Sequence, residues 1–88
     1  MAAEYLLECF WPGVEVADLR ALDERASRTA AEASVRYLGS LLMRDDEVVL
    51  CLFAGEPAAV LEAARRAQIP FERIVSAARS PWHATATE

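Results

Sequence analysis

Few residues of this 88-residue sequence could carry chemistry, and Glu8 stands out among them. It lies within the apolar run at residues 4–11 (EYLLECFW), and carboxylates are seldom buried without a partner. Because desolvation raises the pKa of a carboxyl group, a buried Glu8 could act as a general acid or base. The structural alternatives are that Glu8 forms an ion pair with Arg36 or Arg79, or that it lies at a sheet edge.

Two cysteines and one histidine are the remaining candidates for metal or nucleophilic chemistry. We expect Cys51 to share a sheet face with Glu8, where a thiolate and a carboxylate could bind a soft or borderline metal or act as a nucleophile pair. His83, from the same chain or a partner chain, would be a further ligand. The alternatives are that Cys51 and Cys9 are small buried hydrophobic residues and that His83 is solvated. No metal-ligand spacing or phosphate-binding loop is present, so the sequence predicts no metal site and identifies no cofactor.

The elements that position these residues follow from turn signals and periodicity. Pro12-Gly13 ends a first strand, a leucine and alanine stripe predicts a helix, and Asp45-Asp46 separates the two strands of a hairpin. We place the solvent side of that first helix at Asp23, Glu24, Arg25 and Arg28. The predicted strands are residues 4–11, 35–44, 48–54 and 71–79, and the predicted helices are residues 16–33 and 57–68.

This order of elements predicts an α+β protein with the ferredoxin-like βαββαβ fold, a four-stranded antiparallel sheet with two helices on one face. We predict a single domain at residues 1–79 and a flexible C-terminal tail at residues 80–88.

Alternation along the strands divides their residues into two sets, and the more uniformly apolar set is assigned to the face under the helices. That set is Leu7, Cys9, Trp11, Val35, Tyr37, Leu41, Leu50, Leu52, Val75 and Ala77. The other set, expected on the open face, is Leu6, Glu8, Phe10, Arg36, Leu38, Ser40, Leu42, Val49, Cys51, Phe53, Ile74 and Ser76. It is still strongly apolar, so we expect a second copy to cover it and form a dimeric α/β barrel. A one-residue error of register would exchange the two faces.

The enclosed space would be a pocket for a small molecule, because sparse polar groups in an apolar cavity are typical of ligand sites. Its predicted lining is Glu8, Phe10, Arg36, Leu38, Ser40, Cys51 and Phe53. One alternative is a small cofactor-free enzyme of isomerase, cyclase or monooxygenase type that uses Glu8 as its acid or base. Others are a metal-binding protein and a purely structural homodimer.

Composition excludes several partners. The net charge of −5 argues against binding to nucleic acid or to an anionic membrane surface. No apolar run approaches the ~20 residues of a membrane span, and a secretory leader pattern is absent, so we expect a cytoplasmic protein. All nine basic residues are arginine, which is typical of a GC-rich bacterial genome.

The segments LLECFWPGV, VRYLGSLLMRDDEVVLCLFAGEPAAVLEAARRAQIPFERIV and their spacing resemble a family of small bacterial domains of unknown function, some of which are labelled nickel-binding proteins. The resemblance covers roughly residues 5–75. It implies a ferredoxin-like fold that is often dimeric. Metal-binding relatives offer histidines early in the chain, whereas this sequence has none before His83. Cys51 and Glu8 are the positions that match a potential ligand.

Overall fold

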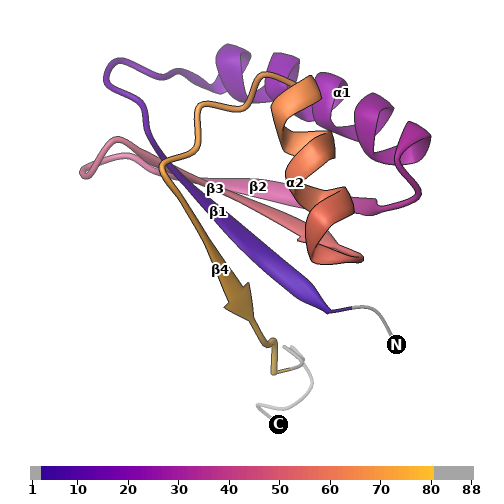
Figure 1. Ribbon diagram of the computed structural model, residues 1–88. Helices are drawn as coiled ribbons and strands as arrows, with labels where there is room; N and C mark the ends of the chain where they lie inside the picture. Colours follow the sequence, from indigo (N-terminus) through magenta and orange to yellow (C-terminus); the bar gives the residue numbers. More distant parts are fainter. Residues whose placement is uncertain (1–2, 81–88) are drawn as a thin grey trace, which may run out of the picture.

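The computed structural model describes residues 3–80 and contains the six elements in the predicted order (Figure 1). They are β1 (Glu4–Phe10), α1 (Val16–Glu32), β2 (Arg36–Met43), β3 (Val48–Ala54), α2 (Pro57–Arg66) and β4 (Arg73–Ala77). The predicted element types are therefore confirmed, with ends that differ by at most a few residues. The predicted tail lies outside the described residues, apart from Ser80.

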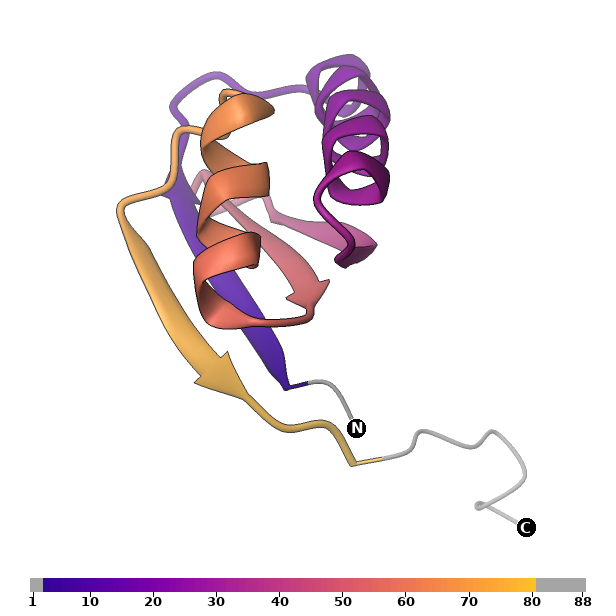
Figure 2. The ribbon, with the colours of Figure 1, turned by 45° about the vertical axis from the view of Figure 1, so that its right-hand side comes forward.

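The four strands form one antiparallel sheet in the order β2-β3-β1-β4. Each βαβ half contributes one central and one edge strand, an arrangement consistent with the ferredoxin-like fold. Both helices pack against the same face of the sheet (Figures 1 and 2). Within residues 3–80 no element covers the opposite face, which we call the open face.

Local signals explain where the helices begin. The backbone N–H of Glu15 donates to the Asp18 carboxylate at 2.9 Å, which satisfies a group that has no partner within the helix. Pro57 occupies the first turn of α2, where its missing N–H costs nothing. Neither helix of the described chain is long and apolar enough to cross a membrane.

Small side chains let the two helices lie close to each other and to the sheet. Ala26 and Ala30 of α1 and Ala63 and Ala64 of α2 are almost completely buried. The Thr29 hydroxyl reaches across and donates to the carbonyl of Ala63 at 3.1 Å. The core between helices and sheet is completed by larger buried residues: Leu7, Cys9, Leu22, Val49, Cys51, Phe53 and Val60.

Strand β2 contains a register irregularity that changes which side chains face the core. Pairing with β3 runs from Tyr37↔Phe53 directly to Gly39↔Leu52, so Leu38 is an extra residue. A bulge of this kind shifts the alternation of the rest of the strand by one position. Residues Ser40 and Leu42 are therefore turned to the helix side, and Leu41 is turned to the open face.

The predicted division into faces is correct for β1 and for the first part of β2, and it is wrong elsewhere. Leu41, Leu50, Leu52, Val75 and Ala77 lie on the open face, whereas Ser40, Leu42, Val49, Cys51, Phe53, Ile74 and Ser76 lie on the helix side. The predicted alternation within β3 and within β4 is confirmed. The prediction of which alternating set of each strand shares a face with which set of β1 is wrong. Both faces are rich in apolar residues, so composition alone does not decide which set is covered.

A close approach fixes the turn between β3 and α2. Gly55 has a φ of 152°, and a Cβ built there would lie 2.6 Å from Cγ1 of Val35. Only glycine fits this backbone conformation and this contact without movement of the neighbour.

Candidate functional site on the open face of the sheet

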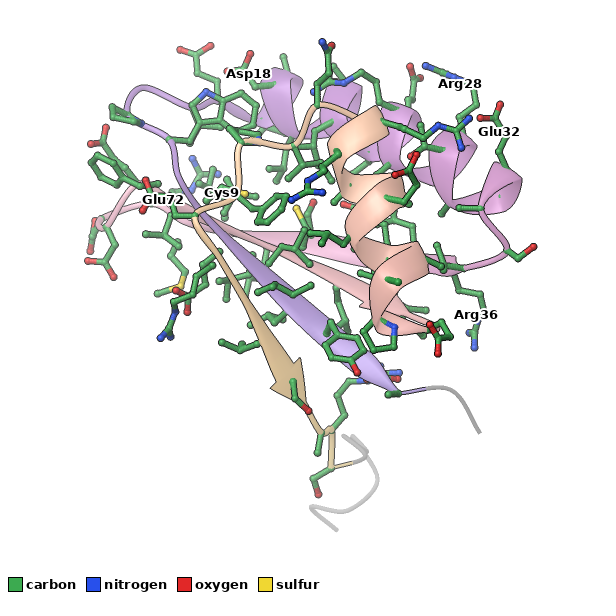
Figure 3. All side chains as sticks on the ribbon, viewed as in Figure 1. Cys9, Asp18, Arg28, Glu32, Arg36 and Glu72 are labelled. Carbon is green, nitrogen blue, oxygen red and sulfur yellow. The ribbon has the colours of Figure 1, made fainter. Side chains whose placement is uncertain are left out.

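The open face is a functional candidate because the structure leaves large apolar side chains exposed there. Leu41 is 60% exposed, Phe10 52% and Met43 40%. Leu50 lies opposite Leu41, and the face continues along the strands with Leu52, Leu6 and Val75; all four are half-buried. Figure 3 shows that side chains project from the sheet on the side away from the two helices. Contiguous apolar patches of this kind mark binding surfaces.

Glu8 lies on this face, and its partner is Arg73, directly opposite on β4. The guanidinium donates through Nε and Nη2 to the two carboxylate oxygens at 2.9 and 3.2 Å, a bidentate geometry. Glu4 and Arg79 form a second bidentate pair, with both distances 3.0 Å. These ion pairs carry the charge of the β1–β4 side of the face.

The Glu8 carboxyl is ionised rather than held neutral. The hydrogen bonds from Arg73 lower its pKa, and they outweigh the opposing effect of desolvation. The expectation of a raised pKa is therefore wrong, because Glu8 is partly exposed and opposite a cation instead of sealed among apolar groups. The expected ion pair is present, but with Arg73 rather than Arg36 or Arg79.

The remaining predicted site residues are divided between the two sides of the sheet. Phe10 and Arg36 join Glu8 on the open side, and Leu38 is the extra residue of the β2 irregularity. Ser40, Cys51 and Phe53 lie on the helix side. The expected pairing of Glu8 with Cys51 is wrong, because the sheet separates their side chains.

A polar network on the helix side was missed by sequence reasoning. The Asp23 carboxylate of α1 accepts hydrogen bonds from the Tyr37 hydroxyl and, at 2.7 Å, from the Ser40 hydroxyl, both of β2. Burial and the Asp23 carboxylate raise the pKa of Tyr37, which therefore stays protonated. Asp23 also lines a shallow surface depression together with Glu24, Ser27 and Arg28. The network ties α1 to the edge strand.

The described donors do not fit a resident nickel ion. Among residues 3–80 there is no group of three His, Cys, Asp or Glu side chains that could hold a metal ion. His83, the single histidine, lies outside the described residues. Cys9 and Cys51 are both free thiols buried in the core.

The fold and the open face define the class of protein: a small α+β domain whose antiparallel sheet is covered, within residues 3–80, by helices on one side only. A family model described as "SCO4226-like: Nickel responsive protein SCO4226-like" matches residues 5–76, so the chain belongs to this family. The match agrees with the resemblance seen in the sequence. Comparison with curated proteins and with solved structures gave no match.

Proposed function

We propose that the protein works as a homodimer joined through the open faces, and that the space between the two sheets binds a small apolar ligand. The observation that carries the proposal is the exposed apolar layer of Phe10, Leu41 and Met43, continued by the half-buried leucines of β1 and β3. A second copy would remove this surface from water, at about 25 cal/mol for each Å² buried.

The size of the face suits a second copy. Four strands at a spacing of about 4.8 Å and seven residues at about 3.4 Å give a flat area of roughly 450 Å². Two copies would bury roughly 900 Å² before the projecting side chains are counted, close to the ~1,000 Å² expected of a biological interface.

The charge of the face also supports self-association. The chain has a net charge of −5, but the open-face carboxylates of Glu4 and Glu8 are each neutralised by an arginine. Arg36 lies near Glu4 and adds a further positive charge on this side. Because the net negative charge is carried elsewhere, two copies could stack these faces without repulsion between like charges.

The ligand chemistry follows from the corrected lining. Glu8, Phe10 and Arg36 remain in the proposed pocket, with Leu38 at its β2 edge. Leu41, Leu50 and Leu52 replace Ser40, Cys51 and Phe53. The lining is then almost entirely aliphatic and aromatic, with charged groups at the β1–β4 side. Such a lining suits a small hydrophobic molecule with one polar end.

The family description favours a second candidate, a metal response of the nickel type. Native mass spectrometry of the full chain as purified tests both candidates together. A dimer that carries the added mass of an organic molecule supports the ligand pocket, and added mass equal to nickel supports the second candidate. A dimer without added mass supports the shared interface and contradicts a ligand retained through purification. A monomer overturns the enclosed pocket.

A further inference from the structure

Two thiols from neighbouring central strands meet in the core on the helix side of the sheet. Cys9 of β1 pairs with Val49 and Cys51 of β3 pairs with Leu7, so the cysteines are diagonal neighbours on one face. Both side chains are completely buried, and each thiol shifts the pKa of the other, so the two thiols lie close together. The Tyr37 side chain is also close enough to affect the pKa of the Cys51 thiol. The two cysteines take no part in the open face or in its ion pairs.

The register favours a bridging ion over a disulfide. Diagonal residues on antiparallel strands have Cα atoms about 7–8 Å apart, whereas a disulfide usually spans about 4.4–6.8 Å. Each strand is also held by a second neighbour, β1 by β4 and β3 by β2, so neither slides easily to close the gap. A metal ion with two bonds to sulfur of about 2.3 Å each spans a wider gap than an S–S bond of about 2.04 Å.

We infer that Cys9 and Cys51 form a buried two-thiol site for a soft monovalent cation of the copper(I) or silver(I) type. Thiolate ligands select such ions. One cation would bind two thiolates and displace both thiol protons. The site would change from neutral to a charge of −1, and no electron would be transferred.

The surroundings provide a route for the displaced protons. The Tyr37 hydroxyl lies near Cys51 and donates to Asp23, whose half-buried carboxylate lines the surface depression on α1. The cation has a different route of access. Cys9 lies near the end of β1 and feels the charge of Glu72, on the connection between α2 and β4 (Figure 3). Local opening of such a connection exposes core groups without unfolding the whole domain.

The test is a titration of the full-length reduced protein with silver(I), followed by native mass spectrometry. We expect one silver ion per chain, with the loss of two protons, and we expect both thiols to become unreactive towards a disulfide reagent under denaturing conditions. The variants Cys9→Ala and Cys51→Ala should each weaken silver binding by at least tenfold. His83→Ala is the matched control and should bind silver as the parent does.

Three results would overturn the site. Two silver ions per chain, one for each thiol, would show independent binding. Unchanged affinity in Cys51→Ala would place the ion elsewhere. Rapid closure of a Cys9–Cys51 disulfide by diamide in the folded protein would contradict the geometric argument. If an alanine variant fails to fold, the stoichiometry of thiol protection in the parent still decides between one shared ion and two separate ones.

Discussion

Replacing Leu41 by aspartate should dissociate the proposed dimer without unfolding the monomer. Leu41 is 60% exposed on the open face, so its side chain contributes little to the core of an isolated chain. Full burial of a leucine is worth about 2 kcal/mol. Burying the exposed 60% in an interface is then worth about 1.2 kcal/mol in each copy.

Two copies lose about 2.4 kcal/mol, which corresponds to a roughly 50-fold increase in the dimer dissociation constant. Burial of an unpaired aspartate in each copy adds to this loss. Sedimentation velocity over a concentration series measures the dissociation constant, and circular dichroism shows whether the monomer stays folded.

Val16→Asp is the matched control. Val16 is 40% exposed but lies at the start of α1, away from the open face, where an acidic residue is favourable for the helix. This variant should leave the dissociation constant within about threefold of the parent value, the usual range for a surface change. Equal constants for Leu41→Asp and the parent would refute the use of the open face, and equal weakening by both variants would show that the effect is not specific to it.

Three further predictions concern the monomer. Asp23→Ala should lower the free energy of unfolding in urea by about 1–3 kcal/mol, because two half-buried hydroxyls lose their acceptor, whereas Glu24→Ala on the same helix should change it by less than about 0.5 kcal/mol. Equal effects would contradict a clamping role. Glu8 has a folded-state pKa below the usual value of about 4.3, so its contribution to stability is present above that pH and is lost as the pH falls through the folded-state pKa. Glu8→Gln should therefore show a shallower loss of stability in acid than the parent, and identical pH profiles would contradict the ion pair. Gly55→Ala should lower the melting temperature more than Gly13→Ala, since both glycines have a positive φ but only Gly55 faces a close valine side chain. The reverse order would contradict the close packing of that turn.

The order of elements was predictable because residues that interrupt strands and helices mark most boundaries. Pro12-Gly13, the acidic hairpin turn, Pro57 and Ile69-Pro70 each fall where one element ends or the next begins. Each of these acts locally, through restricted backbone angles or a missing N–H, so its effect does not depend on the rest of the fold.

The faces of the sheet were not predictable in the same way. Alternation fixes which residues of one strand share a side, but the phase between strands depends on pairing far along the chain. The extra residue Leu38 shifts that phase within β2, and the sequence signal for it is the adjacent Gly39, which has a φ of 136°, since an isolated glycine in a strand often marks a bulge. The wrong phase between β1 and β3 led to the prediction that Cys51 shares a face with Glu8, and so to the predicted metal pair of these two residues.

The partners of charged residues were hidden for the same reason. The sequence shows a carboxylate within an apolar strand and an arginine in the last strand. It does not show that they pair, because the register between β1 and β4 brings Glu8 opposite Arg73. Asp23 was expected on the solvent side of its helix, because an aspartate outside the apolar stripe of a helix is usually exposed to solvent. Its role depends on the approach of Tyr37 and Ser40 from β2.

The central claim, that the open face is covered by a second copy, is tested most directly by the molar mass of the full-length protein in solution. Light scattering coupled to size-exclusion chromatography should give twice the chain mass of 9.7 kDa, with a lower mass appearing only on dilution. A mass of 9.7 kDa at every concentration up to the millimolar range would contradict the claim.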